Sequence, residues 1–178
     1  PTCTCPSASG DLFVSDGYRQ NRVHRFSSDG ELQLSWGSGD LNLYDEMVFD
    51  STATPGTGPG EFHLPHGVTI DSNDRAYVMD RSNNRTQVFD YDGNYLTEWD
   101  TGPMNKAVID GDGILHLVGR DGVNLWSLEG DHIGAWGESG DEPWQFSGGP
   151  HGGWIDSHSD IYVAQVGAEN ALNKFARV

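Results

Sequence analysis

Short apolar runs alternate with polar turns along most of the chain, and this pattern predicts β-strands. Runs such as LFV, AYVM and ILHLV are rich in β-branched and aliphatic residues and are bounded by Asp, Gly, Ser and Asn. No stretch shows the spacing of an amphipathic helix. The sequence therefore predicts an all-β protein.

The strand pattern repeats four times. Each repeat has an apolar strand, a polar loop and a second strand that ends in Phe or Trp, and the repeats cover residues 11–37, 75–100, 113–137 and 160–178. In the first three, a turn (SDG, YDG or LEG) leads to a third strand, and its Gly suits the positive φ of a hairpin. The short strands HGVTID, KAVID and GGWID precede the last three repeats. Four short antiparallel strands per repeat are typical of a β-propeller blade.

We interpret residues 1–178 as a single, partial propeller domain with about four visible blades and a long loop insertion at 37–62. Inner strands are expected near 67–71, 106–110 and 152–156. The first repeat has only PTCTC where its inner strand should be, and the fourth lacks an outer strand. Because an open ring leaves an unpaired strand edge, we expect missing blades or a partner chain to complete it.

Composition narrows the classes of partner. The formal net charge of −17 opposes binding to nucleic-acid phosphates and to anionic membrane surfaces, so we expect no nucleic-acid partner. No apolar run reaches the length of a membrane span. We expect Cys3 and Cys5, the two cysteines, to be thiols, with pairing to a missing segment as the alternative.

Pro-His-Gly occurs twice, at 65–67 and 150–152, and an apolar strand ending in Asp follows each time. The repeat places His66 and His151 where the chain enters an inner strand, two blades apart. They share one face of the propeller with the loop that carries Tyr18 and Arg22. Neutral imidazoles are common zinc ligands. The alternative is that each ring packs locally and bonds to the backbone, and the residues alone leave both interpretations open.

The segments VSDGYRQNRVHRFSSDGELQLSWG, GPGEFHLPHGVTID and DRSNNRTQVFDYDG resemble successive NHL repeats. More narrowly, they resemble the propeller of the peptidyl-α-hydroxyglycine α-amidating lyases. The resemblance implies a six-bladed ring, of which this chain is similar to the last four blades. It implies that His66 and His151 hold an axial zinc ion with a third His from the absent blades. The implied reaction cleaves peptidyl-α-hydroxyglycine to a peptide amide and glyoxylate.

The same resemblance implies substrate contact by Arg22 and makes Tyr18 the candidate catalytic tyrosine. It also implies a structural calcium held by an Asp after the last zinc ligand, but Gly152 stands there and makes calcium doubtful. We expect an extracellular or periplasmic protein acting on a peptide or small molecule. The alternative is a non-catalytic NHL propeller used for binding or extracellular assembly, in which Arg22 and Arg85 brace their loops.

Overall fold

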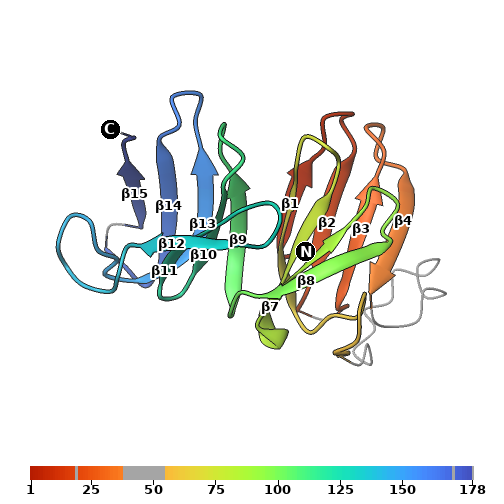
Figure 1. Ribbon diagram of the computed structural model, residues 1–178, viewed down its shortest axis with the longest axis horizontal. Helices are drawn as coiled ribbons and strands as arrows, with labels where there is room; N and C mark the ends of the chain where they lie inside the picture. The colour runs from red at the N-terminus through yellow and green to blue at the C-terminus, as the bar shows by residue number, and fades with distance from the viewer. Residues whose placement is uncertain (19, 38–54, 170, 178) are drawn as a thin grey trace. The chain divides into compact units, whose positions relative to one another are not determined.

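The computed structural model describes residues 1–18, 20–37, 55–169 and 171–177, and the all-β prediction is confirmed there (Figure 1). Among these residues, the helical element is one short 3-10 turn, η2 (Arg81–Asn83), and the strands form antiparallel sheets. The predicted insertion at 37–62 lies largely outside the described residues. None of the described helices is long and apolar enough to cross a membrane.

Each predicted repeat forms one sheet, with its strands in chain order. The first sheet contains β1 (Cys3–Pro6), β2 (Leu12–Asp16), β3 (Arg22–Phe26) and β4 (Leu32–Gly37). The second contains β5 (Pro65–Ile70), β6 (Ala76–Asp80), β7 (Arg85–Phe89) and β8 (Tyr95–Asp100). The PTCTC stretch thus supplies the first strand of the first blade.

The third sheet contains β9 (Met104–Ile109), β10 (Leu115–Gly119), β11 (Gly122–Trp126) and β12 (His132–Trp136). The fourth has three strands in the described residues, β13 (Gly149–Ile155), β14 (Ile161–Val166) and β15 (Leu172–Phe175). The predicted inner strands are therefore confirmed as β5, β9 and β13, and each begins two or three residues earlier than the hydrophobic pattern indicated.

The blades belong to two compact units, Pro1–Pro103 and Met104–Val178, with two blades each. In the first unit β1 and β2 contact β5, and in the second β9 and β10 contact β13. Apolar side chains from facing sheets fill each unit. The first core includes Phe13, Val23, Phe62, Val68 and Phe89, and the second includes Val118, Val123, Phe146 and Val163.

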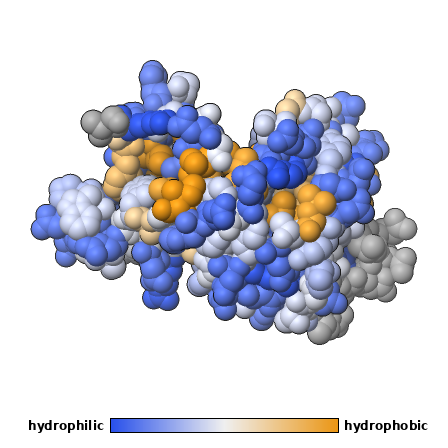
Figure 2. All heavy atoms as spheres, in the orientation of Figure 1, coloured by the Kyte–Doolittle hydropathy of each residue, from blue (hydrophilic) through white to orange (hydrophobic). Residues whose placement is uncertain are grey.

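The recurring Trp residues and the two cysteines extend these cores. Trp36 packs against the first core and Trp136 against the second. Neither Cys3 nor Cys5 forms a disulfide within the described residues. Both lie against the first core, because side chains two positions apart in a strand share a face. Figure 2 shows that the remaining visible surface is mostly hydrophilic, with hydrophobic side chains reaching it in patches.

The tight turn after the first strand has the same side-chain hydrogen bonds in three of the four blades. Asp71, Asp110 and Asp156 each accept hydrogen bonds from the backbone N–H groups two and four residues later. Burial raises the pKa of Asp71, but hydrogen bonds from Arg75, Asn73 and Tyr77 together outweigh burial and hold that pKa below its ordinary value. Ser7 occupies this position in the first blade, where its N–H donates to the carbonyl four residues later.

Candidate functional site

The histidine of each Pro-His-Gly segment is the extra residue of a β-bulge. In β5, Pro65 pairs with Asp80 and Gly67 with the adjacent Met79, so His66 has no residue opposite it. His151 is skipped in the same way between Pro150 and Gly152. A bulge bends the strand and redirects one side chain out of the regular alternation. The histidines thus lie inside the strands β5 and β13, where sequence reasoning had placed them at the strand entrances.

The other two blades have different residues at this position. In the third blade Met104 pairs with Gly119 and Lys106 with Val118, so Asn105 is the bulged residue. In the first blade Thr2 precedes the Cys3–Ser15 pair, as His66 precedes Gly67. Thr2 and the three bulged residues each lie five positions before the turn residue of their blade, which is Ser7, Asp71, Asp110 or Asp156. Along the chain the bulge position is therefore Thr, His, Asn, His.

This alignment refines the sequence interpretation of the third blade. The segment GPMNKAVID, which leads into the third blade, contains no Pro-His pair. Counting back from Asp110 shows that Met104 corresponds to the proline and Asn105 to the histidine. The signal was present in the sequence, because the distance to the turn Asp is the same in all three strands.

Tyr18 and His66, two of the predicted site residues, lie together in the first unit. The Tyr18 hydroxyl is 3.4 Å from Nε2 of His66, and the two rings meet edge to face with centroids 5.8 Å apart. His66 is buried at 3% exposure, whereas Tyr18 is 64% exposed. The pair therefore joins a buried imidazole to a phenol that solvent and solutes can reach.

Arg81 also reaches this pair, and sequence reasoning did not assign it to the site. Its guanidinium carbon lies 5.9 Å from the centre of the Tyr18 ring, within the range of a cation–π contact. Arg81 directly follows Asp80, at the repeat position that Gly17 holds after Asp16. A comparison of the two loops would have revealed a cation in the second blade where the first has no side chain.

Gly17 allows the Tyr18 loop to approach β5 closely. A Cβ atom at this position would collide with the carbonyl oxygen of Pro65, the residue just before His66. The DGY motif therefore needs Gly at its second position, because a larger residue would not fit. The close approach of the loop brings the Tyr18 ring beside the His66 ring.

Arg22 and Arg85 hold equivalent positions at the start of the third strand of their blades. All of Arg85's side-chain nitrogens donate hydrogen bonds: Nε to Asp80 at 2.8 Å, one terminal nitrogen to Glu98 and the Thr57 carbonyl, and the other to the carbonyls of Gly58 and Glu61. Arg85 therefore braces the loop before β5. Arg22 is 1% exposed, and its contact with a substrate stays a prediction.

Comparison with known proteins identifies a repeat, similar sequences and similar folds. The sequence profile of the NHL repeat matches residues 62–89, which run from the loop before β5 to the end of β7. This segment is an NHL repeat. The sequence is 42% identical over 78 residues to NHL repeat-containing protein 3 of Mus musculus, a match that covers 40% of this chain and 22% of that protein.

The sequence is also similar to peptide-amidating enzymes. It is 33% identical over 91 residues to peptidyl-alpha-hydroxyglycine alpha-amidating lyase 1 of Drosophila melanogaster, which covers 50% of this chain and 15% of that enzyme. In structure, it matches a chain of Kuenenia stuttgartiensis hydrazine synthase with a TM-score of 0.69 and 12% identity, over 99% of this chain and 46% of that one. At such low identity, this match shows the fold alone.

The matches span less than a quarter of either of these relatives. They therefore show similarity over part of this chain, and they leave the activity to be argued from the site residues.

Zinc and calcium stay predictions for this propeller. Within residues 1–18, 20–37, 55–169 and 171–177, no three His, Cys, Asp or Glu side chains form a group suited to a metal ion. His66 belongs to the first unit and His151 to the second, where it is half-buried. The two imidazoles suit zinc by donor type, but a protein zinc site takes three or four such ligands.

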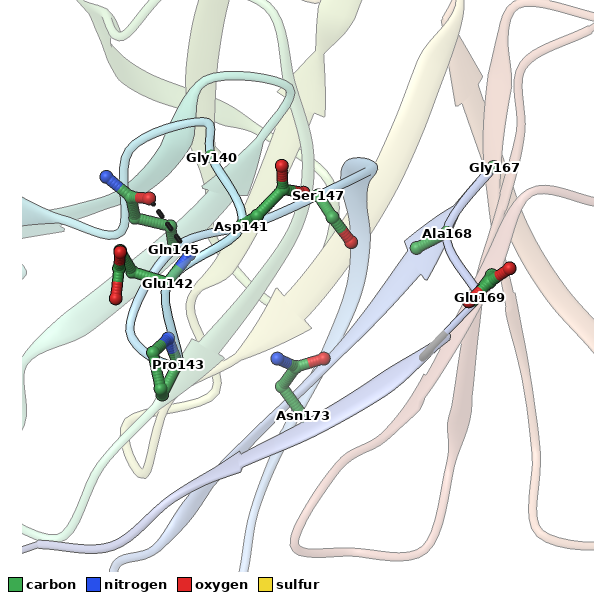
Figure 3. Close-up of a pocket in the computed structure, with 10 residues that line it drawn as sticks. All are labelled: Gly140, Asp141, Glu142, Pro143, Gln145, Ser147, Gly167, Ala168, Glu169 and Asn173. Atoms are coloured by element: carbon green, nitrogen blue, oxygen red, sulfur yellow. Dashed lines mark hydrogen bonds between the residues drawn. The ribbon is translucent and has the colours of Figure 1, made fainter.

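A polar pocket of about 420 Å³ lies in the second unit. None of the predicted site residues lines it. Figure 3 shows its walls, formed by the loop that carries Asp141, Glu142 and Gln145 and by the segment Gly167, Ala168 and Glu169. The Gln145 side chain stabilises the first wall by accepting a hydrogen bond from the Glu142 N–H at 3.1 Å. The pocket is acidic, and none of its lining residues is a bulge residue.

Proposed function

We propose that this chain is the propeller of a peptidyl-α-hydroxyglycine α-amidating lyase, with His66 and His151 as ligands of a zinc ion. The observation that carries the proposal is the shared bulge: both Pro-His-Gly histidines leave the strand alternation at the same place in their blades. A ring can direct equivalent positions of its blades to one axial ion. Homology to the Drosophila lyase supports the reaction type.

The reaction breaks the bond between the amide nitrogen and the hydroxylated carbon. The substrate hydroxyl loses a proton, its C–O bond becomes the aldehyde C=O of glyoxylate, and the leaving nitrogen takes up a proton to give the primary amide. A zinc ion would supply Lewis acidity to the substrate oxygen. Within this chain, we assign the proton transfer to the Tyr18 hydroxyl, because it is exposed to solvent and lies 3.4 Å from His66.

The substrate also ends in a carboxylate, for which the site needs a cation. A chain with a net charge of −17 repels an anionic substrate unless a local positive charge receives it. Arg81 lies against the Tyr18 ring, so we assign it to pair with the substrate carboxylate. Arg22 is the weaker candidate because its guanidinium is buried within its blade.

The zinc ligand set that we propose needs a donor besides His66 and His151. Two imidazoles leave a tetrahedral site short of the usual three protein ligands of catalytic zinc. The family resemblance implies a third histidine, and we propose that it completes the set. Calcium is not part of the proposal, because Gly152 offers no carboxylate next to His151.

The test combines metal content with product analysis. The chain is incubated with a peptidyl-α-hydroxyglycine, and the peptide amide and glyoxylate are quantified by chromatography, with zinc measured on the same sample by mass spectrometry. His66→Ala should remove both zinc and turnover. Its control is His63→Ala, because His63 is exposed and lies three residues upstream. If His66→Ala retains full zinc and full turnover, the proposal is wrong.

A non-catalytic NHL propeller is the second candidate function. It is favoured by the 42% identity to NHL repeat-containing protein 3 and by the bracing role of Arg85. In that case the chain would form no glyoxylate under any metal condition, and Arg81→Met would change nothing in the product assay. The lyase proposal predicts instead that Arg81→Met raises KM for the carboxylate-bearing substrate, by about tenfold or more, since a charged hydrogen bond is lost.

A further inference from the structure

The bulge position in the first blade is occupied by a hydrogen-bond donor that reaches the next blade. Thr2 Oγ1 lies 2.8 Å from the carbonyl oxygen of Pro65, the residue before His66. The same hydroxyl is 2.9 Å from Ser15 Oγ and 3.0 Å from the Ser15 carbonyl. A hydroxyl has one proton, and the Ser15 hydroxyl can donate to Thr2. The Thr2 proton can then be donated to Pro65, which is its closest acceptor.

The bulge position in the third blade makes the equivalent contact in the second unit. Asn105 Nδ2 donates to the carbonyl oxygen of Pro150, the residue before His151, at 3.1 Å. Asn105 is 7% exposed, so this bond is made where water competes little. Thr2 and Asn105 differ in size and chemistry, but both place a donor on the carbonyl of the proline in the following blade.

These bonds act at a point where the regular ladder of the sheet is interrupted. Proline has no N–H to give to the sheet, and the bulge that follows interrupts the ladder. A hydrogen bond to the proline carbonyl from another strand therefore helps to fix the orientation of the Pro–His peptide unit. A tilt of that peptide rotates the Cα–Cβ bond of the histidine and, with it, the direction of the ring.

We propose that Thr2 and Asn105 are positioning residues that fix the direction in which His66 and His151 present their rings to the metal. The inference rests on the proposed function, since it assigns a role toward the same zinc ion. Blades therefore alternate between a clamping residue and a ligating residue: Thr2 clamps for His66, and Asn105 clamps for His151.

The test uses variants that remove the donor and keep the shape as far as the residue type allows. Thr2→Val replaces the hydroxyl by a methyl group, and Thr2→Ser restores a hydroxyl as the conservative rescue. Asn105→Leu removes the amide. Thr4→Val is the control on the same strand segment, because Thr4 is exposed, and Asn124→Leu is the control in the third blade, where Asn124 is half-buried on β11.

Two measurements are made on the 178-residue chain. The first is the imidazole 1H–15N NMR spectrum of the metal-free protein, which reports the ring environment without any metal. The second is Zn²⁺ affinity by competition with a chelating dye, with His66→Ala as the baseline. We expect Thr2→Val to move the His66 ring signals and Asn105→Leu those of His151. Each should weaken zinc binding about tenfold, as loss of a supporting contact around metal ligands typically does.

The controls and Thr2→Ser should leave both the ring signals and the affinity unchanged. The inference is overturned if the ring signals in Thr2→Val and Asn105→Leu match those of the unaltered chain, or if the controls move them equally. If the unaltered chain binds no zinc, the proposed function fails, and the ring signals of the metal-free protein then decide the positioning inference alone.

Discussion

Replacing Arg85 by Met should destabilise the first unit by about 3 kcal/mol or more. The side chain of Asp80 is fully buried, and Arg85 Nε donates to it at 2.8 Å. Removing one partner of a buried ion pair leaves an uncompensated charge, which typically costs about 3–5 kcal/mol. The remaining donors to Asp80, from His63, Asn83 and Gln87, argue for the lower end of that range. Loss of the bonds to the loop carbonyls adds to the cost.

Hydrogen exchange read by mass spectrometry suits this test because it resolves the two units. Arg85→Met should raise exchange in peptides of β6 and β7, and urea unfolding followed in the same peptides gives the free energy. Arg120→Met is the control, since Arg120 is exposed in the corresponding loop of the third blade. Asp80→Asn should recover part of the loss when combined with Arg85→Met. A change below about 1 kcal/mol for Arg85→Met would refute the bracing role.

Three further outcomes are expected. Burial lowers the pKa of His24 from 6.5 to about 4. The contribution of neutral His24 to the free energy of unfolding should therefore be complete above pH 6.5 and should fall by up to about 3 kcal/mol towards pH 4, because the unfolded state takes up the proton first. In urea unfolding, His24→Gln should abolish that part of the pH profile. Gly17→Ala should cost about 1–3 kcal/mol and move the His66 ring signals, whereas Gly111→Ala, which has open space, should do neither. Light scattering should show concentration-dependent association, because Trp154 is 60% and Leu172 65% exposed; a monodisperse monomer would contradict this.

The strands were predictable because local information determines them. Apolar runs, Asp-Gly turns and the recurring Trp positions mark β2 to β4 and β6 to β8 in the sequence itself. The first strand, β1, was uncertain because PTCTC has little apolar character. It becomes a strand through its pairing with β2 and its contacts with β5. Such contacts between distant segments leave no local pattern.

The candidate site was predictable in part for the same reason. The repeat placed Tyr18 and His66 on one face, and the structure brings them together. The bulges depend on how two strands align, which hydrophobic alternation does not encode. Arg81 was missed because a charged loop residue is usually solvated. Burial of Arg22 was also not anticipated, because buried arginines need partners that only the folded loop supplies.

Zinc titration of the metal-free chain, followed through its histidine ring signals, tests the central claim most directly. The account predicts that the signals of His66 and His151 change together, with one midpoint and an endpoint of a single zinc ion per chain. The signals of the exposed His63 and His158 should stay in place. If His66 and His151 respond at different zinc concentrations, or if neither responds, the two bulged histidines do not share a metal and the proposed site is wrong.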